Sequence, residues 1–128
     1  MLILFSIVLS FLVSEMTMII VVISILLLFL YSKYLKRIPL VGNIIVAFLT
    51  GLVFIFGGVV VENPIAAIAP AVFAFLINLI REIVKDMEDV EGDSRAGVTT
   101  FPIRFGFKNS RLLIVILTIL LILFTFFP

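Results

Sequence analysis

The stretch that decides the fold runs from Arg81 to Gly106 and reads REIVKDMEDVEGDSRAGVTTFPIRFG. It holds six of the chain's eight acidic residues, although the sequence on either side of it is almost entirely apolar. Ionisable side chains next to membrane-embedded segments are costly and are usually functional. We therefore expect the functional site of the chain in this stretch.

The composition around this stretch predicts an integral membrane protein. Of 128 residues, 64% are hydrophobic and only 13% are charged, and the mean hydropathy is +1.45. A typical soluble domain is about half apolar and about a quarter charged. A compact body of this size has too much surface to bury so many apolar side chains. A bilayer must therefore solvate most of them.

The residue types of the chain also restrict which metal ions it could bind. The chain contains no cysteine and no histidine. Disulfides, thiolate metal sites and an imidazole general base are therefore ruled out. Any metal ion must be held by oxygen atoms, which favours Mg²⁺, Mn²⁺ or Ca²⁺.

Five apolar segments predict a polytopic bundle of transmembrane helices, with about four to five spans. The segments cover residues 1–14, 16–32, 43–61, 65–83 and 110–127. The first reaches only about 21 Å as a helix, whereas the hydrocarbon core is about 30 Å thick. We interpret it as the back half of a span that starts before this chain. Ser14 is a candidate N-cap for the second helix, and Pro39 and Gly42 are expected to end it.

Charge in the loops predicts the orientation of the bundle. The loop at 33–42 carries Lys33, Lys36 and Arg37, the turn at 62–64 carries no basic residue, and the loop at 85–111 carries several. Two spans separate the two basic loops, so both lie on one side, which the positive-inside rule makes cytoplasmic. The basic and acidic stretches could therefore meet in space.

Three glycines in the third span, Gly51, Gly57 and Gly58, allow two interpretations. Small residues let neighbouring helices approach closely. The alternative is that they leave room for the hydrocarbon chain of a ligand.

Helical spacing places Glu82, Asp86, Asp89 and Asp93 on an arc of about 60°. We expect the helix to end at Gly92, so that Asp93 lies on the turn. Clustered carboxylates repel each other unless a cation neutralises them. Since Mg²⁺ combines one or two carboxylates with waters and substrate phosphates, the cluster predicts half of a pyrophosphate site.

Simpler interpretations exist for both charged clusters. The acidic residues could be the solvated end of a helix, with Arg81, Glu82, Lys85 and Asp86 as ion-pair decoration. Lys33, Lys36 and Arg37 could anchor the membrane boundary, or could bind phosphate across the mouth of a cavity. Residues 97–100 and Pro102 are expected to form a shaped loop, in which Gly97 adopts a conformation that other residues avoid.

These motifs resemble the UbiA-type intramembrane prenyltransferases. The pattern Asp86-x-x-Asp89-x-x-x-Asp93, followed by RAGVTTFP at 95–102 and by Gly106, resembles the second aspartate-rich motif of that family. The run RExxKDxEDxxGD, with YSKYLKRxPLxGN upstream, is most similar to the archaeal branch of digeranylgeranylglyceryl phosphate synthases. The match is specific over about 25 residues at the acidic motif, and the helix layout fits nearly the whole chain.

The resemblance implies an enzyme of about nine transmembrane helices around a central cavity. Its expected activity is Mg²⁺-dependent transfer of a geranylgeranyl group from geranylgeranyl diphosphate to geranylgeranylglyceryl phosphate, an ether-lipid precursor. It implies that Asp89 and Asp93 are the catalytic, metal-binding pair, with Asp86 a further metal ligand. It assigns phosphate binding to Lys36 and Arg37, and we expect Arg81 and Lys85 to bind the diphosphate with them. We expect a multi-pass protein of the cell membrane, with the bilayer and lipid substrates as partners and no nucleic acid.

The family's first aspartate motif, of the NDxxDxxxD kind, is absent from residues 1–128. The chain is therefore expected to be a single, partial transmembrane domain that covers the middle portion of the family pattern, and to need the first motif for activity. Three other functions stay open: an aromatic, quinone, chlorophyll or haem precursor as acceptor, a channel or transporter fragment with a carboxylate ring, and an inactive membrane fragment.

Overall fold

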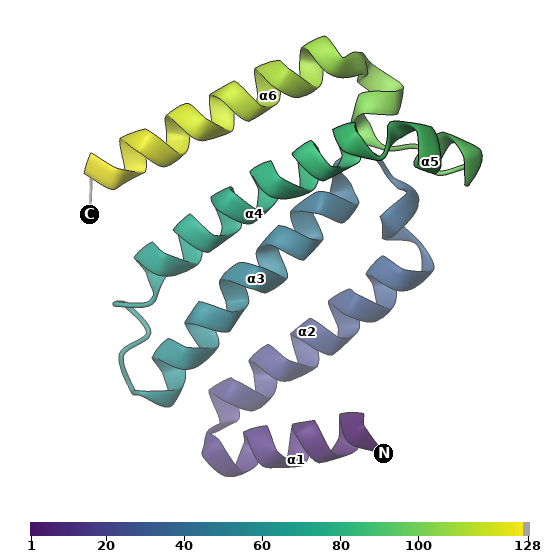
Figure 1. The fold of residues 1–128 in the computed structure, drawn as a ribbon. Helices are drawn as coiled ribbons and strands as arrows, with labels where there is room; N and C mark the ends of the chain where they lie inside the picture. Colours follow the sequence, from purple (N-terminus) through teal and green to yellow (C-terminus); the bar gives the residue numbers. More distant parts are fainter. Residues whose placement is uncertain (127–128) are drawn as a thin grey trace.

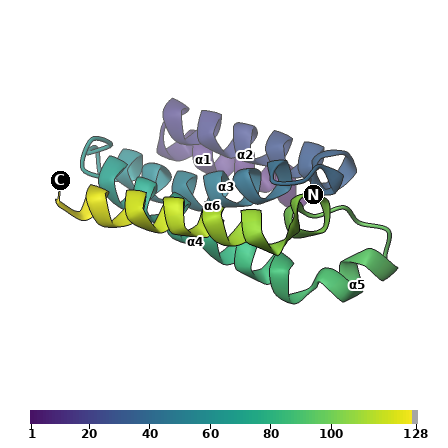
Figure 2. The same ribbon diagram turned by 90° about the horizontal axis from the view of Figure 1, so that it is seen from above.

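A computed structural model describes residues 1–126 as a row of helices that runs back and forth (Figure 1). The elements are α1 (Leu2–Val13), α2 (Glu15–Lys33), the 3-10 helix η1 (Leu35–Arg37), α3 (Val41–Val60), α4 (Ile68–Glu88), α5 (Val90–Arg95) and α6 (Phe101–Phe126). The packed pairs are α1 with α2, α2 with α3, α3 with α4, and α4 with α6. Seen from above, the short α5 extends away from this row (Figure 2).

The prediction of an all-helical membrane bundle is confirmed. Three helices, α2, α3 and α6, are long and apolar enough to cross a membrane. Helix α4 has 21 residues, but its C-terminal end carries charge. Helix α1 has 12 residues and is short, as predicted. The last predicted span was expected to end at residue 127, which lies outside the described residues.

Two predicted helix breaks are wrong. Gly42 does not end a helix but lies buried in the first turn of α3, where a Cβ atom would be 3.3 Å from the ring of Tyr31. The chain turns instead through η1 and Leu40, whose φ is 67°. Gly92 lies inside α5, because the break falls earlier, at Asp89, whose φ of −93° and ψ of 9° leave the helical region.

The start of the last helix also differs from the prediction. Helix α6 begins at Phe101 rather than near residue 110, and it is interrupted at Gly106, where φ is 82° and ψ is 161°. Pro102 belongs to its first turn and not to a loop. A proline is tolerated there because the N–H that it lacks has no partner within the helix.

The predicted cap at Ser14 is confirmed. Its Oγ accepts a hydrogen bond from the backbone N–H of Thr17, and the Thr17 hydroxyl oxygen accepts one from the N–H of Ser14, both at 3.1 Å. The buried Thr17 hydroxyl also donates to the carbonyl oxygen of Ser10 at 2.6 Å. The turn between α1 and α2 thus satisfies polar groups within an otherwise apolar region.

Helices α3, α4 and α6 share a small core made of Ala47, Leu79, Ile83 and Leu117. Glycines let α3 pack closely against α4 at Gly51 and against the turn that leads into α4 at Gly58. A Cβ atom on Gly51 would lie 3.0 Å from the carbonyl oxygen of Ala71, and one on Gly58 would lie 2.4 Å from the Cβ of Ala67. The interpretation of tight packing therefore holds for Gly51 and Gly58. At Gly57 a Cβ atom would meet nothing within 4 Å.

The neighbouring glycines provide a matched test of this packing. Gly58→Ala should lower the free energy of unfolding by about 1–3 kcal/mol, because the added methyl group forces the backbones apart. Gly57→Ala should leave it unchanged or raise it by up to about 1 kcal/mol through helix propensity. Unfolding of both variants in detergent micelles measures the difference. Equal stability of the two would contradict the close contact of Gly58 with Ala67 at the start of α4.

Candidate functional site

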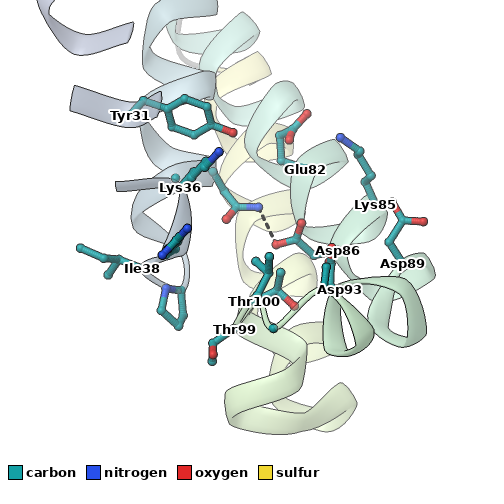
Figure 3. A pocket seen from close by; sticks show the side chains of 17 residues that line it. Tyr31, Lys36, Ile38, Glu82, Lys85, Asp86, Asp89, Asp93, Thr99 and Thr100 are labelled. Carbon is teal, nitrogen blue, oxygen red and sulfur yellow. Dashed lines mark hydrogen bonds between the residues drawn. The ribbon is translucent and has the colours of Figure 1, made fainter. Parts of the chain in front are cut away.

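A cavity of about 460 Å³ opens at one end of the bundle (Figure 3). Its walls come from the end of α2 and η1, the first turn of α3, the C-terminal part of α4, α5 and the loop that leads to α6. Seven charged residues line it: Lys36, Arg37, Glu82, Lys85, Asp86, Asp89 and Asp93. The cavity therefore brings together most of the residues that the sequence singled out.

The two charged walls meet because α3 and α4 form an antiparallel hairpin. The hairpin returns the chain to the end at which α3 began, so that η1 and the end of α4 lie close together (Figure 1). Lys36 and Arg37 thereby share a cavity with carboxylates that lie about fifty positions later in the sequence. The prediction that the basic and acidic stretches could meet in space is confirmed.

The acidic wall of the cavity consists of Glu82, Asp86, Asp89 and Asp93, and it continues across the break between α4 and α5. The backbone N–H of Asp93 donates to the carbonyl oxygen of Asp89 at 2.9 Å, which continues the helical spacing across the break. Glu82, Asp86 and Asp93 are half-buried, whereas Asp89 is exposed. In Figure 3 the Asp89 side chain lies on the outer side of the acidic wall.

Asp86 occupies the centre of this wall. The side-chain amide of Asn43 donates to its Oδ2 at 2.9 Å (Figure 3). Asp86 lies beyond the apolar part of α4, and its partial burial raises the pKa of its carboxyl group. The hydrogen bond from Asn43 lowers that pKa, and the negative charges of Asp93 and Glu82 raise it. An ionised Asp86 is thus held at a cost in free energy that a bound cation would relieve.

Sequence reasoning missed a role for Asn43. The residue belonged to the quoted YSKYLKRxPLxGN run, but no chemistry was assigned to it. The available signal was an amide at the start of an otherwise apolar helix. Its partner, 43 positions away, becomes visible only once the hairpin is folded.

The predicted diphosphate-binding residues divide into two groups. Lys36, Arg37 and Lys85 line the cavity with exposed side chains. Arg81 is not part of the lining: its side chain is 72% exposed and lies 3.9 Å from Glu82. Lys33 also lies outside the lining and packs over the rings of Phe29 and Tyr34, as expected for a side chain at a membrane boundary.

The loop before α6 closes the remaining side of the cavity. Gly97 has a φ of 69°, which confirms that it supplies a conformation that other residues avoid. The N–H of Val98 donates to the carbonyl oxygen of Asp93 at 2.9 Å and ties the loop to the acidic wall. The hydroxyl oxygen of Thr100 is buried without a hydrogen-bond partner, although its residue lines the cavity.

The carboxylates of the cavity fit an Mg²⁺ site and do not fit a Ca²⁺ site. Among residues 1–126, no three acidic side chains converge closely enough to form a metal cage. A Ca²⁺ site needs six to eight oxygen ligands, whereas Mg²⁺ keeps several waters and uses one or two carboxylates with substrate phosphates. With basic side chains on the opposite wall, the donor set fits Mg²⁺ that arrives with a phosphate-bearing ligand.

A second, apolar cavity of about 300 Å³ lies between α3 and α4. Its lining contains only apolar residues: Phe48, Gly51, Leu52, Ile55, Ile68, Ala71, Val72 and Phe75. Gly51 thus both packs against α4 and borders an open groove. Tight packing and room for a hydrocarbon chain, the two interpretations of this glycine, are compatible.

Comparison with known proteins finds relatives that share one name. Digeranylgeranylglyceryl phosphate synthase of Methanosphaera stadtmanae is 42% identical over 115 residues, which cover 90% of this chain and 42% of the relative. The enzyme of the same name from Methanothermobacter thermautotrophicus is 52% identical over 73% of this chain and 34% of the relative. The one from Thermococcus kodakarensis is 34% identical over 96% of this chain and 44% of the relative.

The chain thus spans less than half the length of these curated relatives. No solved structure matches it. The family model described as the UbiA prenyltransferase family matches residues 1–128. With the acidic motif, the membrane helices and the named relatives in agreement, this chain belongs to the UbiA prenyltransferase family.

Proposed function

We propose that this chain forms part of an enzyme that transfers a geranylgeranyl group from geranylgeranyl diphosphate to geranylgeranylglyceryl phosphate in the membrane. The observation that carries the proposal is the charged cavity at the end of an apolar bundle, in which Lys36 and Arg37 of η1 share the lining with four carboxylates and with Lys85 of α4. The name shared by the relatives, at 42% and 52% identity, supports the choice of donor and acceptor.

The basic residues bind the diphosphate of the donor in this proposal. Lys36 and Arg37 from η1 and Lys85 from α4 reach the cavity from different walls. Charge-assisted hydrogen bonds from these side chains orient the diphosphate and favour its departure, because negative charge grows on the leaving oxygen. Arg81, which was predicted to belong to this set, lies outside the cavity lining and is not assigned a direct contact with the diphosphate.

Asp86, Asp89 and Asp93 are the proposed Mg²⁺-binding residues, with Asp89 and Asp93 as the catalytic pair. One or two of these carboxylates would hold an ion together with waters and the diphosphate. A bound Mg²⁺ would neutralise the negative charge that develops on the leaving diphosphate. The half-buried Asp86 and Asp93 supply fixed negative charge at the cavity, and the exposed Asp89 adds a carboxylate on its outer side. We place this end of the bundle on the cytoplasmic side, on the ground that both basic loops lie there.

The apolar groove between α3 and α4 is proposed to shelter the hydrocarbon. Phe48 and Phe75 lie on its lining, on the bilayer side of Asn43 and Glu82 respectively. With the diphosphate in the charged cavity, a prenyl chain could extend along this groove. The groove keeps water away from the reacting carbon. As the bond between that carbon and the diphosphate oxygen breaks, the acceptor's hydroxyl oxygen bonds to the carbon, and the hydroxyl proton passes to the released diphosphate.

The runner-up is a different acceptor within the same family, such as an aromatic or quinone precursor. The charged cavity serves the diphosphate in either case, so it does not separate the two. Incubation of the complete protein with labelled geranylgeranyl diphosphate and each acceptor in turn would separate them. A labelled ether lipid supports the first proposal, and a labelled aromatic product would replace it.

Substitution of Asp86 tests whether its carboxylate binds a cation or only supports the fold. In EDTA, Asp86→Asn should be as stable as the parent chain or more stable, because a neutral amide removes the cost of half-burying a charge. With Mg²⁺ and pyrophosphate at about 100 times their Kd, the parent chain should gain about 2.7 kcal/mol, and Asp86→Asn should gain much less. Thermal unfolding in detergent measures both effects.

The control for this experiment is Glu88→Gln, which removes an exposed carboxylate of the same helix outside the cavity. It should keep the full gain in stability with Mg²⁺ and pyrophosphate. If Asp86→Asn also keeps that gain, the acidic wall does not bind the cation.

Substitutions of Lys33, at the end of α2, and Lys36, in η1, distinguish phosphate binding from membrane anchoring. Lys36→Gln should weaken pyrophosphate binding in the presence of Mg²⁺ by about tenfold, because one hydrogen bond to a charged group is lost. Lys33→Gln should leave the affinity unchanged, since Lys33 lies outside the cavity. Titration calorimetry in lipid nanodiscs measures both affinities. Equal effects of the two substitutions would favour a general anchoring role for the loop.

A further inference from the structure

Asn43 connects the first turn of α3 to the acidic wall. It lines the charged cavity, and its amide donates to Oδ2 of Asp86 at 2.9 Å. In residues 1–126 this is the only hydrogen bond between side chains of two different helices. The one polar link between the long helices therefore ends on a carboxylate of the site.

The hydrogen-bond donor to Asp86 is the side-chain amide of Asn43, which carries no charge. In the described part of the chain, no Lys or Arg nitrogen lies within 4.0 Å of the Asp86 carboxylate. A basic partner in the place of Asn43 would cancel the negative charge and compete with a cation. An amide instead fixes the orientation of the carboxylate and leaves its charge in place.

Asp86 needs such a restraint because it faces like charge. Glu82 lies one turn before it, and Asp93 lies on the next helix, and the charges of both act on Asp86. Without a restraint, repulsion would turn the carboxylate away from its acidic neighbours. The hydrogen bond holds Oδ2 toward α3, so that the second oxygen, Oδ1, has no partner among the described side chains.

We propose that Asn43 is a positioning residue, which holds Asp86 in one orientation so that its free oxygen binds the cation that accompanies the diphosphate. This inference rests on the proposed function and adds to it a residue outside the aspartate-rich motif. Asn43 acts through Asp86, so the effect of removing it depends on whether Asp86 is present.

A double-mutant cycle tests this dependence. The parent chain, Asn43→Leu, Asp86→Asn and the double variant are placed in lipid nanodiscs with inorganic pyrophosphate, and Mn²⁺ binding is followed by electron paramagnetic resonance. Asn43→Leu keeps the side-chain volume without the donor and should weaken Mn²⁺ binding five- to tenfold. In the Asp86→Asn background the same change should have no further effect. Asn43→Gln, which keeps an amide, should recover binding to within about twofold of the parent.

Two controls separate positioning from a general loss of structure. Thr50→Val removes a polar group of α3 that bonds only within its own helix, to the carbonyl oxygen of Val46, and should bind Mn²⁺ like the parent. If Asn43→Leu fails to fold, Asn43→Ser, whose hydroxyl is too short to reach Asp86, should show the same loss of affinity.

Three outcomes would overturn the inference. Asn43→Leu could bind Mn²⁺ as tightly as the parent, or it could lose the same factor with and without Asp86. Either result rejects the role of Asn43 and leaves the proposed function standing. Failure of the parent chain itself to bind Mn²⁺ with pyrophosphate would reject the proposed function, and the role of Asn43 with it.

Discussion

The close packing of α3 against α4 is the constraint on which the rest of the structure depends. At Gly51 the two helices approach until an added methyl group would crowd the backbone of Ala71, and at Gly58 the connecting turn packs so closely that one would collide with Ala67. Since apolar side chains gain nothing from leaving lipid, such contacts depend on van der Waals fit. The same hairpin brings the end of α4 back beside η1 and thereby creates the charged cavity.

The hairpin also explains how one short chain can offer two environments to one ligand. Toward the middle of the helices, α3 and α4 border an apolar groove, and at their end they border a cavity lined with charge. A prenyl diphosphate has the same division, with a hydrocarbon chain and an anionic head. Asn43 lies at the boundary between the two regions, because it belongs to the first turn of the apolar helix α3 and its amide contacts the carboxylate of Asp86 in the cavity.

The sequence predicted the long helices from the length of its apolar segments, and the acidic wall from helical periodicity. The helix was predicted to break at Gly92, but it breaks at Asp89. Glu82, Asp86, Asp89 and Asp93 nevertheless line the same cavity. The hydrogen bond from Asn43 could not be predicted, since it depends on the register of α3 against α4. Nor could the difference between Gly57 and Gly58, which are adjacent in sequence but face different surroundings.

The central claim is that the charged cavity binds the diphosphate of a prenyl donor together with Mg²⁺. Titration of geranylgeranyl diphosphate into the chain in lipid nanodiscs, once with Mg²⁺ and once with EDTA, tests it most directly. The structure predicts saturable binding that requires Mg²⁺ and that inorganic pyrophosphate displaces. Binding of equal affinity in EDTA, or binding that pyrophosphate does not displace, would show that only the hydrocarbon is recognised and would contradict the claim.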